Sequence, residues 1–248
     1  LALVVLLILP ACQAPAQVVE TATPAQVVET AAPTQVVENA APEAQTYPLE
    51  VSTEEAYPVE EQAQEPAAEE KVTIDYAKNF TLEYKEGYKL LTVLTPWASA
   101  TEPLLYVLVP KGQPDPSGVE GAMIVHTPVE SFGSLSSTYL PFLEQVGELE
   151  SLVAVSSGAY VFNPEVQNWL QAGAVSEVGS GAEVNVERLV DLNPELVMTS
   201  ASGYLEYDSH PQLLEAGLKV VINSDYLEQN PLGRAEWGKF IAAFFDKE

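Results

Sequence analysis

The chain has 248 residues, of which 36 are Asp or Glu and 10 are Lys or Arg, so its formal net charge is −26. This acidity argues against a nucleic-acid partner, because phosphate binding requires clustered Lys and Arg. The single Cys excludes an intrachain disulfide and a Cys-based zinc site, and two His far apart in the sequence make a His-rich metal site a poor prediction.

The charge is distributed unevenly between two parts of the chain. Residues 1–70 contain 12 Glu and no Asp, Lys, Arg or His, whereas residues 71–248 contain the other 24 acids and all 10 bases, a net charge of −14. The second part has 178 residues, which is long enough for one compact core.

The chain opens with an apolar run, Leu1–Pro10, and then Ala11 and Cys12. The run is too short to span a bilayer as a helix, which needs about 20 residues. It matches the apolar region of a secretory signal, and Leu9-Pro10-Ala11-Cys12 is similar to a bacterial lipobox. The alternative is an incidental Cys in an ordinary signal peptide. Because the lone Cys lies where the apolar run gives way to a polar linker, we predict a lipoprotein signal over 1–12 with lipidation at Cys12.

Residues 13–70 have the composition of a spacer. Three copies of a nine-residue unit (AQVVETATP, AQVVETAAP and TQVVENAAP) occupy 16–42, and 43–70 continue acidic and Pro-bearing. Each copy carries a Pro and at least one acid but no aromatic residue, so it cannot bury enough surface to offset its ordering entropy. A stalk of short Val-Val strands is the less favoured alternative.

From Lys71 onward the pattern indicates an ordered domain that begins with β-strands. Thr81–Tyr84 and Tyr88–Leu94 flank Lys85-Glu86-Gly87, which predicts a hairpin with Gly at its turn. Two further short strands are expected over Leu104–Val109 and Ala122–His126.

After these strands the pattern alternates between helix and strand. We expect helices over Thr138–Leu149, over Val166–Leu170 after the cap Asn163, over Val186–Leu192 after the cap Asn185, and over Pro211–Ala216, with strands at Leu152–Val155, Leu196–Thr199 and Leu218–Ile222. This order predicts an α/β fold with a largely parallel sheet covered on both faces. Ligands bind such sheets beyond the carboxyl ends of the strands. Those ends are rich here in hydroxyls, Gly and Tyr: Ser134–Thr138, Ser156–Tyr160, Ser200–Tyr204 and Asn223–Tyr226.

The last segment predicts a helix with an aromatic stripe. Asn230-Pro231 is a favourable cap, and Trp237, Phe240, Ile241, Phe244 and Phe245 recur at helical spacing. The stripe stops at Glu248 without a Gly or Asn stop signal, so we expect something to pack beyond its end. Together with the absence of an initial Met, this predicts that the sequence is a fragment.

Four stretches resemble the substrate-binding proteins of ABC importers for ferric siderophores and cobalamin. They are Tyr76–Val93, Ser136–Val155, Val178–Val197 and Asn230–Phe245, in the order of that family. The third is the most specific, because its Leu192-Asn193-Pro194-Glu195-Leu196-Val197 is close to the family's Leu-x-Pro-Asp-Leu-Val signature, with Glu195 in place of the usual Asp.

The resemblance implies a Rossmann-like N-terminal lobe of a two-lobed receptor over 71–230. Residues 231–248 would begin the long helix between the lobes, and the C-terminal lobe would lie outside this chain. A monomeric, lipid-anchored protein on the extracytoplasmic face of the membrane would capture a small chelate and deliver it to an ABC permease. No catalytic residue, cofactor or metal site is predicted. The absence of the second lobe would leave ligand binding by half a cleft in question, because tight sites bury about 70–90% of a ligand.

Cleft candidates follow three of the strands and the last loop of the lobe. They are Ser136, Ser137, Thr138 and Tyr139; Ser157, Gly158 and Tyr160; Ser202, Gly203 and Tyr204; and Tyr226. The first group is equally explained as a helix cap with Tyr139 packed inside. Any single Tyr of the others is more often ordinary loop packing, and only the convergence of the loops favours a site.

Two further features concern partners. The family's Glu that docks on the permease corresponds to Glu187, which is also explained as a solvated acid at a helix start. Neither Arg of the chain, Arg188 or Arg234, lies in the cleft loops, whereas an anionic ferric catecholate favours Arg clusters. This half of the cleft therefore favours an uncharged hydroxamate complex or a corrinoid.

Two other classes of function compete with a solute receptor. An envelope-tethered hydrolase is less favoured, because the sequence has no Gly-x-Ser-x-Gly elbow and only His126 and His210 as bases. An adhesive or interaction lipoprotein that keeps the lobe without transport remains the alternative.

Overall fold

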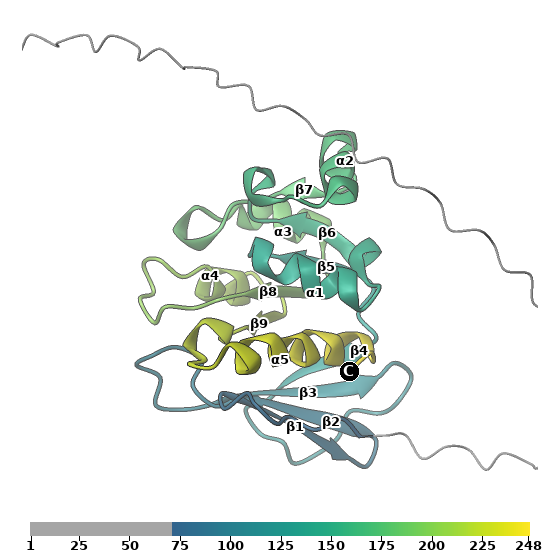
Figure 1. Ribbon diagram of the computed structural model, residues 1–248, viewed down its shortest axis with the longest axis vertical. Helices are drawn as coiled ribbons and strands as arrows, with labels where there is room; N and C mark the ends of the chain where they lie inside the picture. The colour runs from purple at the N-terminus through teal and green to yellow at the C-terminus, as the bar shows by residue number, and fades with distance from the viewer. Residues whose placement is uncertain (1–70) are drawn as a thin grey trace, which may run out of the picture. The chain divides into compact units, whose positions relative to one another are not determined.

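The computed structural model describes residues 71–248, so the predicted signal, Cys12 and the repeat-bearing linker lie outside the described residues. The described part contains a mixed sheet and a parallel sheet (Figure 1). Within 71–248, no helix combines the length and the apolar character needed to cross a membrane.

The first sheet is formed by the N-terminal strands, in the order β1-β2-β3-β4. Its members are β1 (Phe80–Lys85), β2 (Tyr88–Val93), β3 (Leu104–Pro110) and β4 (Met123–Thr127). The first three are antiparallel, and β4 joins β3 in parallel. The predicted hairpin is confirmed, and Gly87 takes the positive φ of +82° that its turn requires.

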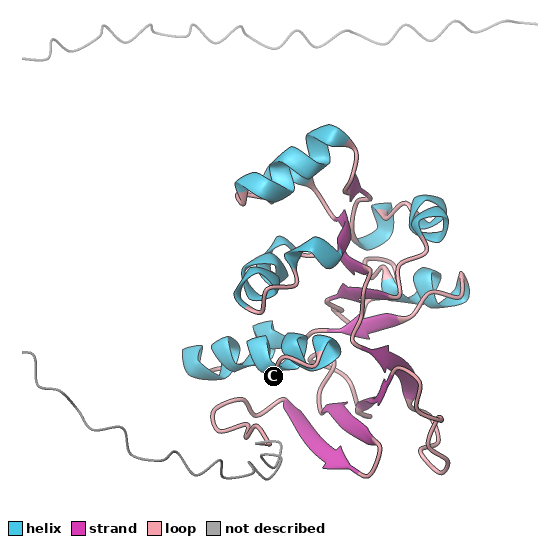
Figure 2. Ribbon diagram, turned by 90° about the vertical axis from the view of Figure 1, so that its right-hand side faces the viewer, coloured by secondary structure: helices cyan, strands magenta, loops and turns pink. Residues whose placement is uncertain are grey.

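The second sheet is wholly parallel, as predicted, with the order β7-β6-β5-β8-β9. Its strands are β5 (Phe132–Ser134), β6 (Leu152–Val155), β7 (Ser176–Glu177), β8 (Leu196–Thr199) and β9 (Val220–Ile222). Helices lie on both faces of this sheet (Figure 2), namely α1 (Leu140–Gln145), α2 (Pro164–Ala172), α3 (Val186–Leu192), α4 (His210–Glu215) and α5 (Pro231–Ala242).

The helix boundaries follow the predicted caps. The side chain of Asn163 accepts hydrogen bonds from the N–H groups of Glu165 and Val166, and Asn185 accepts one from Arg188. The helix expected over 138–149 is shorter: a 3₁₀ turn at Ser137–Tyr139 precedes α1, which ends at Gln145, and Gly147 then takes a φ of +74°. A left-handed Gly ends the helix early, which the apolar spacing alone did not indicate.

The aromatic stripe of α5 and of the 3₁₀ turn that follows it, Ala243–Phe245, fills the core of this domain. Trp237, Phe240 and Phe244 are fully buried, and Phe240 packs edge-on against Phe80 of β1 at a ring distance of 5.5 Å. Phe245 contacts Phe132 of β5 at 5.7 Å, so the stripe touches both sheets. Within residues 71–248 the two sheets therefore cover the stripe, whereas packing beyond its end, and with it the fragment, stays a prediction.

The helix expected over 231–248 is also shorter than predicted. The α-helix ends at Ala242, a 3₁₀ turn follows at Ala243–Phe245, and Asp246 takes a left-handed conformation with φ of +55°. Lys89 of β2 then forms ion pairs with Asp246 and Glu248. The side chains of the last residues thus return to the first sheet.

Candidate functional site

The order of the parallel sheet places a switch point between β5 and β8. The chain leaves β5 toward β6 and β7 on one side, and it leaves β8 toward β9 on the other. Helix α1 follows β5, α2 follows β6 and α4 follows β8. Because consecutive connections diverge here, their loops leave a crevice at the carboxyl ends of these two strands. This is where a ligand site is expected.

A cavity of about 490 Å³ occupies that position. Its volume falls within the range of roughly 300–1,000 Å³ that is usual for small-molecule sites. Most of its lining comes from loops that follow β2, β5, β7, β8 and β9, and more than half of the lining residues carry a hydroxyl group. The lining residues are Ala98, Leu135, Ser136, Ser180, Gly181, Thr199, Ser200, Ala201, Ser202, Tyr207, Asp208, Ser209 and Tyr226.

The loop after β8, residues 200–209, is organised by the carboxylate of Asp208, which is 6% exposed. One oxygen accepts hydrogen bonds from the N–H and the hydroxyl of Ser202 at 2.7 and 2.8 Å. The other accepts from the N–H of Gly203 at 2.9 Å. Since charge-assisted bonds are the strongest of their kind, Asp208 fixes the start of this loop relative to its end.

Two further hydrogen bonds hold the same wall. The hydroxyls of Thr199 and Ser209 lie 3.2 Å apart, and the hydroxyl of Tyr226 donates to the carbonyl of Ala201 at 2.7 Å. These bonds join β8, the loop 200–209 and the turn after β9 around the cavity. The walls are therefore set by the domain itself before any ligand arrives.

The charge around the cavity is negative. No Lys or Arg belongs to its lining within the described chain, and Asp208 is the one charged residue there. Burial raises the pKa of Asp225 nearby, and burial together with the carboxylates of Asp208 and Asp225 raises the pKa of the Tyr226 hydroxyl. Arg234 lies outside the lining and acts on Asp225, whose pKa it lowers in part. Within the described lining itself, a multiply anionic ligand would meet the carboxylate of Asp208 and no Lys or Arg.

The predicted cleft residues divide into two sets. Ser136, Ser202 and Tyr226 line the cavity, one from each of three loops. Tyr139 is 1% exposed, so the alternative that it packs inside is the one observed, and burial raises its pKa above the ordinary range. The other predicted residues are near the same edge but are not part of the lining: Ser137, Thr138, Ser157, Gly158, Tyr160, Gly203 and Tyr204.

Sequence reasoning missed several lining residues. Asp208 and Ser209 lie late in the loop after β8, and the prediction stopped that loop at Tyr204. The pair Ser180-Gly181 follows the two-residue strand β7, which has no hydrophobic pattern to announce it. A signal was nevertheless present, because Asp208 precedes the predicted start of α4 by only a few residues and acids commonly organise such loops.

Glu187 lies in the first turn of α3 with an exposed side chain. Asn185 supplies the cap of this helix, so Glu187 is not required as a capping group. Its carboxylate is available at the surface, as docking on a partner would need. The docking role itself stays a prediction.

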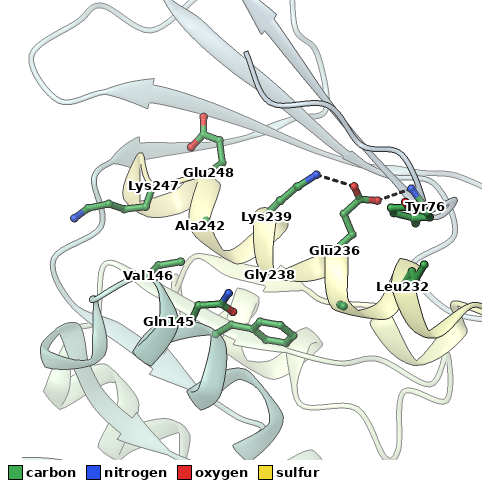
Figure 3. A pocket seen from close by; sticks show the side chains of 12 residues that line it. Tyr76, Gln145, Val146, Leu232, Glu236, Gly238, Lys239, Ala242, Lys247 and Glu248 are labelled. Atoms are coloured by element: carbon green, nitrogen blue, oxygen red, sulfur yellow. Dashed lines mark hydrogen bonds and ion pairs between the residues drawn. The ribbon is translucent and has the colours of Figure 1, made fainter. Parts of the chain in front are cut away.

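A second, larger cavity of about 640 Å³ lies beside α5 (Figure 3). Its wall on α5 is formed by small residues such as Ala235, Gly238 and Ala242, with Phe142 of α1 opposite. Lys239 and Lys247 at its edge are already paired with Glu236 and Glu148. No loop that follows a strand of the parallel sheet belongs to its described lining, so the cavity at the switch point is the candidate site that the fold favours.

Sequence comparison connects the chain to archaeal lipoproteins. It is 26% identical over 213 residues to lipoprotein MJ0878 of Methanocaldococcus jannaschii and 28% identical over 145 residues to lipoprotein MJ0872 of the same organism. These matches cover 74% and 56% of this chain, but 49% and 36% of the relatives, so the chain spans about half or less of their length. No family model matches the chain.

Structural comparison finds partial overlaps with two binding proteins. The petrobactin-binding protein YclQ from Bacillus subtilis overlaps 50% of this chain and 41% of its own, with 17% identity and a TM-score of 0.39. The periplasmic vitamin B12-binding protein BtuF of Vibrio cholerae overlaps 46% of this chain and 47% of its own, with 18% identity and a TM-score of 0.30.

Fold and site together define an α/β domain with a hydroxyl-lined cavity at the switch point of a parallel sheet. The curated relatives are both lipoproteins, the class that the start of the sequence predicts. Because both TM-scores lie below 0.5, the functional assignment rests on the residues of this chain.

Proposed function

We propose that this chain is the ligand-capturing lobe of a lipid-anchored solute-binding protein that serves an ABC importer. The observation that carries the proposal is the cavity between the ends of β5 and β8, which has the size of a small-molecule site and preformed polar walls. Hydroxyl and backbone groups there can donate to and accept from a polar ligand without requiring it to carry charge.

The ligand class follows from the same walls. Without Lys or Arg in the described lining, and with Asp208 and Asp225 close by, the cavity favours an uncharged ligand over an anionic one. Tyr207 and Tyr226 add flat apolar faces that suit a macrocycle or a chelate with aliphatic arms. An uncharged ferric hydroxamate or a corrinoid meets both requirements.

The predicted lipid on Cys12 and the acidic linker support a location outside the cytoplasmic membrane. The relatives, which are lipoproteins, support the same location. The exposed carboxylate of Glu187 would then contact basic residues of the permease, with a monomer as the acting form. The cavity would capture the ligand, and Glu187 on α3, which is not part of the cavity lining, would dock on the permease.

An enzymatic role has less support. His126 is hydrogen-bonded to Asp115 at 3.0 Å rather than to a hydroxyl nucleophile. Nδ1 of His210 is buried without a hydrogen-bond partner in the described part of the chain. Within residues 71–248, no hydrogen bond joins either histidine to a hydroxyl, the pair on which acyl transfer by a Ser nucleophile relies.

The proposal is tested by titrating the protein with cyanocobalamin and with an uncharged ferric trihydroxamate, using calorimetry. Ser180 is exposed at the rim and its side chain caps no helix, so Ser180→Trp fills the cavity without removing a structural bond. Ser117, exposed in the loop after β3, provides the matched control Ser117→Trp. We expect one probe to bind, with affinity reduced at least about tenfold by Ser180→Trp and unchanged by Ser117→Trp. Binding by neither probe, or equal binding by both variants, would contradict the proposal.

A further inference from the structure

Trp97 comes from the connection between β2 and β3, yet it contacts the loop that walls the cavity. It packs partly buried against the core cluster of the parallel sheet, while most of its neighbours in sequence belong to the first sheet. The next residue, Ala98, lines the cavity directly. One short segment of the N-terminal sheet thus reaches the ligand site.

The contact between Trp97 and Gly203 is exceptionally close. Gly203 has a φ of +84°, and a Cβ atom added there would overlap Cδ1 of the indole and lie 2.9 Å from its Nε1. Only a residue without a side chain can therefore occupy this position while the indole stays in place. The same residue donates its N–H to Asp208, so the indole packs against the point where the loop is fastened.

The indole also contacts the other end of the loop. It stacks on the imidazole of His210, with a centroid distance of 5.7 Å and an interplanar angle of 27°. His210 is the first residue of α4 and follows Asp208 and Ser209, which line the cavity. Trp97 therefore touches the loop near its start, at Gly203, and at its end, at His210.

We propose that Trp97 is a positioning residue of the ligand site, which fixes the loop 200–209 in its binding conformation without itself belonging to the lining. This inference rests on the proposed function for the meaning of the loop, but its physical basis is the contact with Gly203 and His210. The loop carries three exposed hydrophobic side chains, Tyr204, Leu205 and Tyr207, which tend to collapse or reorient when unsupported. The indole packed against the loop keeps Tyr207, the one of the three that lines the cavity, in place.

Hydrogen exchange of the loop amides tests this role without any ligand. The N–H groups of Ser202 and Gly203, both bonded to Asp208, report the loop, and those of β8 report the sheet. In the full protein, we expect Trp97→Ala to speed exchange at Ser202 and Gly203 at least about tenfold, with β8 unchanged. Trp97→Phe, which retains a flat ring over His210 but lacks the indole atoms against Gly203, should give a smaller effect.

A pair of glycines supplies the matched control. Gly203 and Gly217 have nearly the same φ, +84° and +85°, but a Cβ at Gly217 would meet no atom within 4 Å. Both Gly→Ala changes carry the same backbone strain, and only Gly203→Ala displaces the indole. We expect Gly203→Ala to speed exchange of the Ser202 amide, Gly217→Ala to leave it unchanged, and Trp97→Ala to abolish most of the added effect of Gly203→Ala.

The possible results separate the positioning role from an ordinary packing role. Equal acceleration in the loop and in β8 would show that Trp97 only stabilises the core and would overturn the inference. Unchanged exchange at Ser202 in Trp97→Ala, or equal effects of Gly203→Ala and Gly217→Ala, would overturn it as well. A failure of both probe ligands to bind the unmodified protein would instead contradict the proposed function, because the exchange measurement uses no ligand.

Discussion

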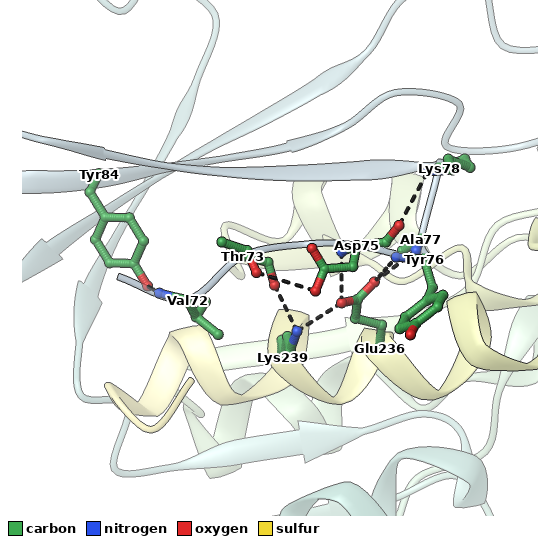
Figure 4. A network of polar contacts seen from close by, with 9 residues as sticks. All are labelled: Val72, Thr73, Asp75, Tyr76, Ala77, Lys78, Tyr84, Glu236 and Lys239. Carbon is green, nitrogen blue, oxygen red and sulfur yellow. Dashed lines mark hydrogen bonds and ion pairs between the residues drawn. The ribbon is translucent and has the colours of Figure 1, made fainter. Parts of the chain in front are cut away.

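The carboxylate of Glu236 on α5 accepts a hydrogen bond from the backbone N–H of Tyr76 at 2.7 Å, across 160 residues of sequence (Figure 4). The same carboxylate accepts from Asp75 and Ala77, and Glu228 accepts from the next two N–H groups, those of Lys78 and Asn79. Five consecutive amides of the entering chain are thus held by two buried acids. This clamp holds residues 75–79, where the chain enters the domain, against α5 and the residues just before it.

Replacing Glu236 by Gln should destabilise the domain. One oxygen of Glu236 serves Tyr76 and Ala77, and the other serves Asp75 and Lys239. In either orientation, the amide nitrogen of Gln would face donors where an acceptor is needed. We expect Glu236→Gln to lower the free energy of unfolding by about 2 kcal/mol or more in urea titrations. Glu83→Gln, on an exposed pair with Lys85, should change it by less than about 0.5 kcal/mol. Equal effects of the two changes would refute the clamp.

The clamp should also make stability depend on pH in a defined window. Burial alone would raise the pKa of Glu236, but the N–H of Asp75, the Lys239 ammonium and the N–H groups of Ala77 and Tyr76 together lower it from 4.5 to about 2. The unfolded chain therefore binds the proton first, so this contribution is present above about pH 4.5 and is lost as pH falls toward about 2. The difference in unfolding free energy between the wild type and Glu236→Gln should stay constant above about pH 4.5 and narrow as the pH falls from there toward about 2. A constant or widening difference would rule out this assignment.

The aromatic stripe of α5 should carry much of the domain's stability. Phe240 is fully buried and contacts Phe80, Tyr106, Trp237 and Phe244. We expect Phe240→Ala to cost about 3–5 kcal/mol in chemical denaturation. Leu232, on the same helix but 54% exposed, offers the control Leu232→Ala, with an expected cost below about 0.5 kcal/mol. A cost as small as that of Leu232→Ala would contradict the placement of Phe240 in the domain core.

The titration of His210 reports the charge of the loop. Burial lowers the pKa of this imidazole, and the carboxylate of Asp208 opposes that effect. In Asp208→Asn the opposing charge is removed, so the pKa of His210 should fall further below its ordinary value of 6.5. The ring-proton shifts of His210 followed by NMR against pH provide the measurement. A pKa that stays the same or rises would show that Asp208 does not face the imidazole.

The elements with strong local signals could be predicted from the sequence. The strands β6 and β8 and the helix α3 have the predicted bounds, because apolar runs and an Asn cap mark them within a few residues. The strand β5 escaped prediction, since it is three residues long and its central residue, Gly133, contributes no side chain to an apolar pattern. Local patterns also gave no sign that the strands would divide between two sheets.

The sequence indicated which loops would form the candidate site, but not which of their side chains would line it. The rule that ligands bind beyond the strand ends indicated the loops of Ser136, Ser202 and Tyr226, and these residues line the cavity. It could not show that Tyr139 turns inward or that Asp208 folds back on Ser202, because those outcomes depend on contacts between segments. The same limit applies to Trp97, which a single sequence presents only as an apolar residue between two strands.

We propose above that the cavity at the ends of β5 and β8 takes an uncharged chelate. The most direct test of this proposal takes the uncharged probe that binds, cyanocobalamin or the ferric trihydroxamate, and compares its affinity with that of a trianionic ferric tris-catecholate at one ionic strength. With Asp208 in the described lining and no Lys or Arg there, the uncharged probe should bind at least about tenfold more tightly. Equal or tighter binding of the tris-catecholate would contradict the account.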